Sequence, residues 1–271
     1  MRIGAILPIT PGDGSPMHAR HFADSARMIE QSGLSSVWTF DAIGRGFMLP
    51  DPLQALTIAA TVTEHIELGT GVLQLPIRNV SEVVHRALMV HLVAPGRFLL
   101  GIGCGSTGAD FAAFAADYAA RHDRFAEQAP ELRNALRTGL VHGIDLAPWP
   151  AAQGGPPLLV GAWLGPWVGR AAAEYDGWIA SAAKTTGGDD AIAERLARYR
   201  AAGGMRAIVT NIRASTDLGP TLDRLDRFAA LGFDDAVVFD LSLDARRAAA
   251  FASRATPTPS TPSTTPPRRQ P

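Results

Sequence analysis

The 271-residue sequence is poor in cysteine, and its charges nearly balance. The single cysteine, Cys104, excludes a disulfide within the chain, and the seven histidines have no spacing typical of metal ligands, so we predict no metal site. The formal net charge is −1 and the arginines are scattered, which argues against nucleic acid or an anionic membrane as a partner. We therefore expect a small-molecule partner.

Lysine is almost absent as well, because Lys184 is the only lysine among 25 lysine and arginine residues. It lies in the segment WIASAAKTTGGDD, residues 178–190. Lysine is a compact point charge whose pKa changes readily on burial, whereas arginine is a planar, bidentate donor. Two readings stay open: an ordinary surface residue, or a contact to an anionic group of a ligand.

The start of the chain also lacks the features of a targeting segment. The first residues, MRIGAILPI, are too short and too bounded by proline for a signal peptide or a membrane span. We therefore expect a cytoplasmic protein.

What the sequence does contain is a repeated pattern of short apolar runs, each followed by a helical pattern. This alternation predicts a parallel sheet covered by helices, and eight runs of this kind predict a single (βα)8 barrel of the α/β class over residues 1–254. Residues 255–271 are rich in proline, threonine and serine and are expected to form a disordered tail. The eight runs span residues 2–7, 35–40, 65–70, 97–102, 157–161, 177–181, 207–212 and 235–240.

The longest connection between these runs, residues 104–156, predicts a helix that is interrupted at Pro130. A loop rich in glycine, proline and alanine follows, and it is a candidate lid over the barrel mouth. Asp51 is expected to cap a helix that begins at Pro52, and Gly33 to end an earlier one.

In a (βα)8 barrel the active site lies at the carboxyl ends of the strands. Two glycine-rich segments follow such ends, GIGCGST at 101–107 and VGAWLGPWVGRAAA at 160–173. Glycines there allow backbone to approach a flat ring or a phosphate, and a helix that begins near Pro166 would offer free amides to an anion. The alternatives are ordinary turns. A lone Cys104 between glycines is more typical of a lining residue than of a nucleophile.

These segments, together with SSVWTFDA and DPLQALTIAATVTEHIELGTGVL, resemble in their order the bacterial luciferase-like family of flavin- and deazaflavin-dependent oxidoreductases. The resemblance covers residues 1 to about 240 and implies the same barrel. It implies that coenzyme F420 or FMN lies across the strand ends, and that homodimers are a candidate assembly. The compact barrel favours F420, with FMN as the alternative.

The resemblance also implies site residues. A non-proline cis peptide is expected at Gly71 to Val72, and Asp41 matches an aspartate that is commonly followed by a histidine used in proton handling. In this chain that histidine is replaced by Ala42, so protons would be handled by Asp41 alone or by a residue that the sequence does not identify. Asp41 is the candidate catalytic residue. Lys184 matches a lysine that meets a substrate phosphate. The implied cofactor contacts are Thr70, Gly71, Val72, Cys104, Gly105, Ser106, Gly161, Ala162, Gly165 and Pro166.

The expected reaction is transfer of hydride between reduced F420, or FMN, and a small organic substrate. One alternative is an FMN-dependent monooxygenase that uses reduced flavin and oxygen. A second is a lyase that forms a Schiff base through Lys184, because barrel aldolases place such a lysine after the sixth strand. A third is a flavin-binding relative without catalysis.

Overall fold

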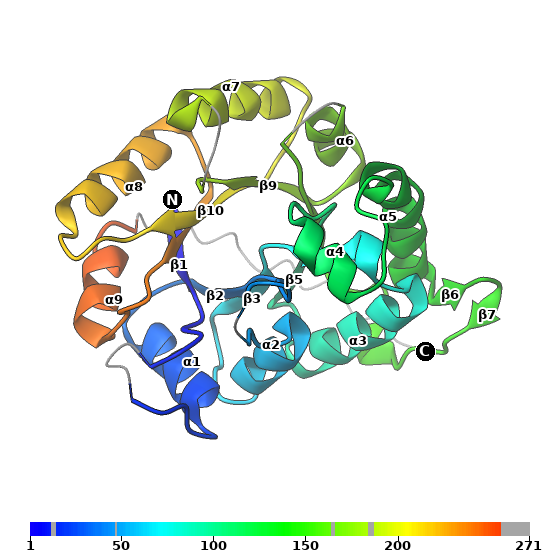
Figure 1. Ribbon diagram of the computed structural model, residues 1–271, viewed down its shortest axis with the longest axis horizontal. Coiled ribbons are helices and arrows are strands. Elements are labelled where there is room, and N and C mark those ends of the chain that lie inside the picture. The colour runs from blue at the N-terminus through cyan, green and yellow to red at the C-terminus, as the bar shows by residue number, and fades with distance from the viewer. Residues whose placement is uncertain (12–14, 47, 164–165, 184–186, 256–271) are drawn as a thin grey trace, which may run out of the picture.

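The computed structural model describes residues 1–11, 15–46, 48–163, 166–183 and 187–255. Eight parallel strands form a barrel that the pairing of β3 with β5 closes (Figure 1). The eight-stranded barrel predicted from the sequence is confirmed, and the ends of each strand lie within two residues of the predicted run. The barrel strands are β1 (Arg2–Ile6), β2 (Ser36–Thr39), β3 (Glu67–Thr70), β5 (Phe98–Gly103), β8 (Leu158–Gly161), β9 (Gly177–Ser181), β10 (Ala207–Arg213) and β11 (Asp235–Phe239).

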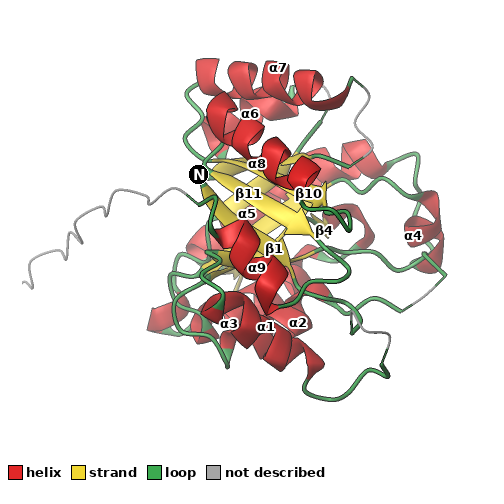
Figure 2. Ribbon diagram, turned by 90° about the vertical axis from the view of Figure 1, so that its left-hand side faces the viewer, coloured by secondary structure: helices red, strands yellow, loops and turns green. Residues whose placement is uncertain are grey.

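Helices surround the strands as an outer ring, and α4 (Gly108–Ala113) stands apart from that ring (Figure 2). The ring contains α1 (His21–Gln31), α2 (Pro52–Ala60), α3 (Val80–Val93), α5 (Arg121–Thr138), α6 (Trp167–Glu174), α7 (Gly188–Ala201), α8 (Gly219–Leu231) and α9 (Ala245–Ala252). Shorter elements are β4 (Leu73–Gln74), the 3-10 turns Leu75–Ile77 and Pro150–Ala152, and a hairpin of β6 (Leu140–Val141) and β7 (Ile144–Asp145). No helix among the described residues has the length and apolar character needed to cross a membrane.

The helix boundaries follow the predicted end signals. The Asp51 carboxylate accepts hydrogen bonds from the backbone nitrogens of Leu53 (3.1 Å) and Gln54 (3.0 Å), and Pro52 occupies the first helical position of α2. Gly33 follows α1 with a φ of 82°, a conformation that glycine adopts without strain.

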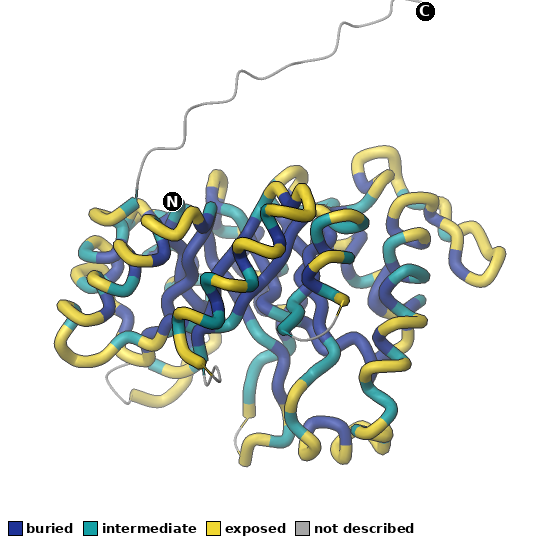
Figure 3. Tube along the Cα trace, turned by 90° about the horizontal axis from the view of Figure 1, so that it is seen from above, coloured by how far each residue is buried: buried dark blue, intermediate teal, exposed yellow. Residues whose placement is uncertain are grey.

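The interior of the barrel is apolar, whereas its amino-terminal end is closed by ion pairs. Seven of the eight strands contribute buried apolar side chains to the inner layer, and β3 contributes Gly69, against which the Trp38 indole packs. At the amino-terminal end, Arg2 and Arg206 both pair with Glu67 and Asp235 at 2.6 to 3.3 Å. Figure 3 shows that the strands at the centre are buried and that the outer faces of the helices are exposed. The carboxyl ends of the strands are therefore where a ligand site can form.

The predicted helix break at Pro130 is wrong, because α5 continues through this residue. Pro130 removes the hydrogen bond that the carbonyl of Ala126 would accept. Ala126 is exposed to solvent, so water can satisfy that carbonyl, while the neighbouring Ala129 is buried against the core. The actual break lies at residues 114–120, between α4 and α5.

The interpretation of the loop after α5 as a lid is also wrong. Helix α5 returns the chain from the carboxyl ends of the strands to their amino-terminal ends, as helices of a (βα)8 barrel do. Residues 139–157 therefore lie between the end of α5 and the beginning of β8, where Pro150–Ala152 packs against α3. This loop is remote from the barrel mouth.

Candidate active site at the barrel mouth

The floor of the barrel mouth is apolar. Phe40, Val72 and Phe239 lie above the inner layer and are partly exposed, and the rings of Phe40 and Phe239 meet edge to face at 5.7 Å. The Gly71–Val72 peptide bond is cis, as the resemblance implied. This floor suits the face of a flat, apolar ring.

Two glycines make room for the side chain of Val72. A Cβ atom on Gly103 would lie 2.6 Å from Val72 Cγ2, and one on Gly161 would lie 2.5 Å from Val72 Cγ1. These separations are far below van der Waals contact, and the two glycines are register partners on β5 and β8. The absence of side chains at Gly103 and Gly161 therefore lets Val72 pack down between β5 and β8. The spacing of glycines in the sequence did not reveal this role.

Thr70, a predicted cofactor contact, is fully buried behind this floor. Its hydroxyl donates to the carbonyl of Gly101 (2.7 Å) and accepts from the nitrogen of Gly101 (2.9 Å). This exchange continues the pairing of β3 with β5 beyond Gly69 and Leu99. In the described structure, the Thr70 side chain holds the barrel closed beneath the predicted site.

The segment Cys104 to Ser106 lines one side of the mouth. Gly105 has a φ of 76°, and a Cβ atom there would lie 2.5 Å from Gln74 Oε1. Burial raises the pKa of the Cys104 thiol, although the nearby Arg121 opposes this effect, so the thiol is neutral at pH 7. Ser106 is exposed, and its carbonyl accepts a hydrogen bond from the Tyr118 hydroxyl (3.1 Å).

The segment after β8 lines the adjacent side. Gly161 and Ala162 are partly exposed, and the carbonyl of Ala162 accepts from Trp178 Nε1 at 2.8 Å. Pro166 is exposed at the N-cap position of α6, which has no capping side chain. Gly165 and Lys184 lie outside the described residues, so the contacts predicted for them stay predictions.

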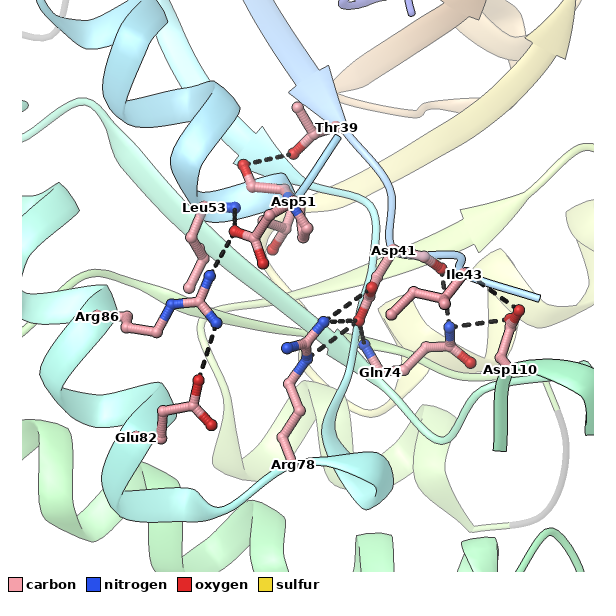
Figure 4. Close-up of polar contacts among 12 residues, drawn as sticks. Thr39, Asp41, Ile43, Asp51, Leu53, Gln74, Arg78, Glu82, Arg86 and Asp110 are labelled. Atoms are coloured by element: carbon pink, nitrogen blue, oxygen red, sulfur yellow. Dashed lines mark hydrogen bonds and ion pairs between the residues drawn. The ribbon is translucent and has the colours of Figure 1, made fainter. Parts of the chain in front are cut away.

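Asp41, the candidate catalytic residue, forms a buried ion pair with Arg78 (Figure 4). Arg78 Nη2 donates to both carboxylate oxygens at 2.8 and 2.9 Å, and Arg78 Nε and the nitrogen of Gln74 also donate, at 3.2 and 3.0 Å. The role predicted for Asp41 stays a prediction, and this geometry bears on it. Arg78 favours the charged form of Asp41, so release from Arg78 would make the carboxylate more basic, whereas burial already raises the pKa of Asp41 within the pair.

A second carboxylate, Asp110 of α4, is fully buried and was missed in the sequence. It accepts hydrogen bonds from the backbone nitrogens of Ile43 (3.2 Å) and Gly44 (2.9 Å), and it forms an ion pair with Arg45 at 2.9 Å. Burial acts to raise the pKa of Asp110, but the hydrogen bonds from Arg45, Gly44 and Gln74 outweigh it and hold the pKa below its usual range. Asp110 thus clamps the segment after β2 against α4.

Gln74 connects these two carboxylates. Its Nε2 donates to the carbonyl of Asp41 (2.9 Å) and to Asp110 Oδ2 (3.0 Å), and because both partners are acceptors the orientation of the amide is fixed. Figure 4 shows Gln74 between Asp41 and Asp110. Its Oε1 is buried and has no hydrogen-bond partner among the described residues.

Ala42, which stands where the family commonly has a histidine, is buried beside Asp41. The described part of the chain contains no cluster of three histidine, cysteine or acidic side chains that could hold a metal ion.

The closed parallel barrel, with an apolar floor and glycine-rich segments at its mouth, defines the class of (βα)8 proteins that bind ligands at the strand ends. A family model for the luciferase-like monooxygenases matches residues 1–215. The chain therefore belongs to the luciferase-like monooxygenase family.

Sequence comparison finds a curated relative of the chain. The chain is 29% identical over 186 residues to 4-hydroxyprotoasukamycin monooxygenase of Streptomyces nodosus subsp. asukaensis, a match that covers 64% of this chain and 50% of the relative. The chain thus spans about half the length of that curated relative.

Two solved structures share its fold at low sequence identity. An F420-dependent secondary alcohol dehydrogenase, in complex with an F420-acetone adduct, has a TM-score of 0.69 and 15% identity over 92% of this chain and 96% of that one. The oxygenating constituent of 3,6-diketocamphane monooxygenase from Pseudomonas putida, in complex with FMN, has a TM-score of 0.63 and 17% sequence identity. The match covers 86% of this chain and 73% of that one. At these identities the likeness concerns the fold, and it leaves the choice between F420 and FMN open.

Proposed function

We propose that this protein is an oxidoreductase that binds F420 or FMN across the barrel mouth and transfers hydride between the reduced cofactor and a small organic substrate. The observation that supports it most is the floor formed by Phe40, Val72 and Phe239, with Val72 seated over two glycines. An apolar surface of this kind stabilises the face of a ring by removing it from water.

The residues present fit such a cofactor in two respects. The apolar floor matches the ring, and two polar atoms near the mouth, Gln74 Oε1 and Arg121 Nε, are buried without a partner among the described residues. When bound, the cofactor would supply the redox chemistry, either as a hydride donor or as a reduced flavin that reacts with oxygen.

The chain itself would position the cofactor and exclude water. Val72 would support the ring from below, Cys104 to Ser106 would line one edge, and Gly161 to Pro166 the other. Asp41, fixed by Arg78, would orient the backbone between β2 and β4, and release from Arg78 would free its carboxylate for proton handling. Lys184 remains the proposed contact to an anionic group of the substrate.

An FMN-dependent monooxygenase is the second candidate. The observation that favours it is the match to 4-hydroxyprotoasukamycin monooxygenase, together with the name of the family model. The two candidates share the site and differ in cofactor and oxidant.

Titration of the purified protein with F420 and with FMN, followed by cofactor fluorescence, tests the proposal. We expect saturable binding of at least one cofactor, with preference for F420; preference for FMN would favour the monooxygenase. Val72→Asp should abolish binding, because it places a charge under the ring, while Ile144→Asp in the remote, exposed β6–β7 hairpin should not. If the wild-type protein binds neither cofactor, the proposed function is wrong.

A further inference from the structure

Arg213, the last residue of β10, is an exposed cation without a carboxylate partner among the described residues. The carboxylates that follow β10 and β11 are engaged elsewhere. Asp217 accepts a hydrogen bond from the first backbone nitrogen of α8 (3.0 Å), and Asp240 forms an ion pair with Arg247 at 2.6 Å. Arg213 therefore leaves one positive charge at the strand ends for a ligand.

A β-bulge in β10 turns Arg213 toward the barrel mouth. Two residues of β10, Thr210 and Asn211, stand opposite the single residue Val237 of β11, whereas the register on either side is one to one. Asn211 has a φ of 59°, which is uncommon for a residue other than glycine. With regular pairing of the same sequence, the alternation of side chains would place Ile212 inside the barrel and Arg213 outside. The bulge reverses this order, as bulges beside active sites often do.

The neighbours of Arg213 agree with this direction. Ile212 is fully buried in the large core that includes the helices, whereas Phe239, the register partner of Arg213, packs against the inner layer of the barrel. The guanidinium of Arg213 lies 5.5 Å from the centre of the Phe239 ring, which in turn meets the ring of Phe40. An arginine is stabilised on an aromatic face, so this charge lies at the edge of the apolar floor.

The rim of this half of the mouth is apolar as well. Strands β10, β11, β1 and β2 are consecutive in the barrel, and β11 and β1 lie opposite β5 and β8, which the predicted cofactor segments follow. The loops after three of these strands expose large apolar side chains: Met17 after β1, Ile43 and Met48 after β2, and Leu241 after β11. Exposed apolar groups on neighbouring loops are typical of a surface that binds a ligand. This half of the mouth is thus free for a substrate and combines apolar surface with one cation.

We propose that this half of the mouth binds an apolar organic acid as the substrate, with its carboxylate on Arg213 and its apolar body against Phe40 and Phe239. The assignment rests on the proposed function and names its substrate class. Arginine pairs with a carboxylate through two parallel hydrogen bonds, and the aromatic floor removes an aromatic or aliphatic body from water. A sugar phosphate would also satisfy the cation, but its hydroxyl groups would face apolar side chains without hydrogen-bond partners.

Calorimetric titration with 2-naphthoate and with 2-naphthamide, its neutral counterpart, tests the assignment in the protein loaded with cofactor. The wild-type protein should bind the acid about tenfold or more tightly than the amide. Arg213→Gln should weaken binding of the acid about tenfold and leave binding of the amide within about twofold, as expected for loss of one charge-assisted contact. Arg213→Lys should retain part of the preference for the acid. Gluconate, a carboxylate with a polyhydroxyl body, should bind far more weakly than 2-naphthoate.

Arg137→Gln and Arg246→Gln are the controls, because each removes one exposed positive charge, at the far end of α5 and on α9. Both should bind 2-naphthoate as the wild-type protein does. The assignment is overturned by equal losses in all three variants, by equal wild-type affinities for acid and amide, by no binding of 2-naphthoate, or by gluconate binding as tightly as 2-naphthoate.

The affinity for the cofactor separates this assignment from two other outcomes. Arg213→Gln should bind F420 or FMN as tightly as the wild-type protein, which also shows that the variant is folded. A weaker affinity for the cofactor would mean that Arg213 serves the cofactor and would overturn the assignment. If the wild-type protein binds neither cofactor, the proposed function has failed, whereas a protein that binds a cofactor without distinguishing acid from amide refutes the substrate class alone.

Discussion

Asp41 and Arg78 form the most deeply buried ion pair near the candidate site, and breaking it should strongly destabilise the fold. Their side chains are 2% and 6% exposed. The substitution Asp41→Asn keeps the shape of the carboxylate but leaves the Arg78 charge buried and unpaired. Removal of one partner of such a pair costs about 3 to 5 kcal/mol, a large share of the roughly 5 to 15 kcal/mol that stabilises a typical domain.

The free energy of unfolding, measured in urea for both proteins, gives the magnitude. The control is Asp226→Asn, which breaks the Arg254–Asp226 pair, whose side chains are 42% and 50% exposed. That variant should lose less than about 1 kcal/mol, because exposed pairs contribute little. The double variant Asp41→Asn/Arg78→Met should be more stable than Asp41→Asn, since it removes the uncompensated charge.

A loss below about 1 kcal/mol for Asp41→Asn would refute the reasoning, because a partner that is buried as completely as Arg78 cannot recover its hydration without local unfolding. If Asp41→Asn stayed stable but lost turnover with a bound cofactor, Asp41 would be a catalytic residue, and its pairing with Arg78 would contribute little to the stability of the fold.

Three further predictions follow from other contacts. The folded-state pKa of Asp110 is held below its unfolded value of about 3.9, so its contribution to stability is present above that pH and is lost as the pH falls through the folded pKa. The melting temperature should therefore drop more steeply below about pH 4 in the wild-type protein than in Asp110→Asn. Gly161→Ala should push Val72 into the mouth and weaken cofactor binding, and adding Val72→Ala should restore it; a variant that binds normally without the second change would contradict this view of the floor. Because burial raises the pKa of the Cys104 thiol, alkylation by iodoacetamide should be slow at pH 7 and faster above about pH 9, and rapid labelling at neutral pH would count against it.

The barrel itself could be predicted from the sequence because its signals are local. Each strand is a short apolar run, and the cap at Asp51 and the helix stop at Gly33 depend on residues next to the element they limit. The prediction of a helix break at Pro130 failed because the deciding factors are not local. Whether a proline ends a helix depends on the solvation of a carbonyl one turn earlier and on packing with distant residues, neither of which a local pattern contains.

The candidate site was only partly predictable for a similar reason. Its general position follows from the rule that strand ends form the mouth, but its polar network joins residues far apart in the chain. Asp110 binds Arg45 from 65 positions away, and Arg78 binds Asp41 from 37 positions away. An acidic residue in the first turn of a helix is common, so nothing nearby in the sequence distinguishes Asp110 from a surface residue.

The clamp at Asp110 has a consequence for the exchange of segments between relatives. Asp110 of α4 holds the segment Ile43 to Arg45. Gly44 also lies close to α4, because a Cβ atom on Gly44 would be 2.5 Å from the carbonyl carbon of Ala109. A chimaera that received the loop after β2 from another enzyme, without the matching α4, would carry a loop with no anchor. Diversification of the mouth in this lineage would then proceed by paired replacement of the two segments, and a library that varies them jointly should yield more folded members than one that varies either alone.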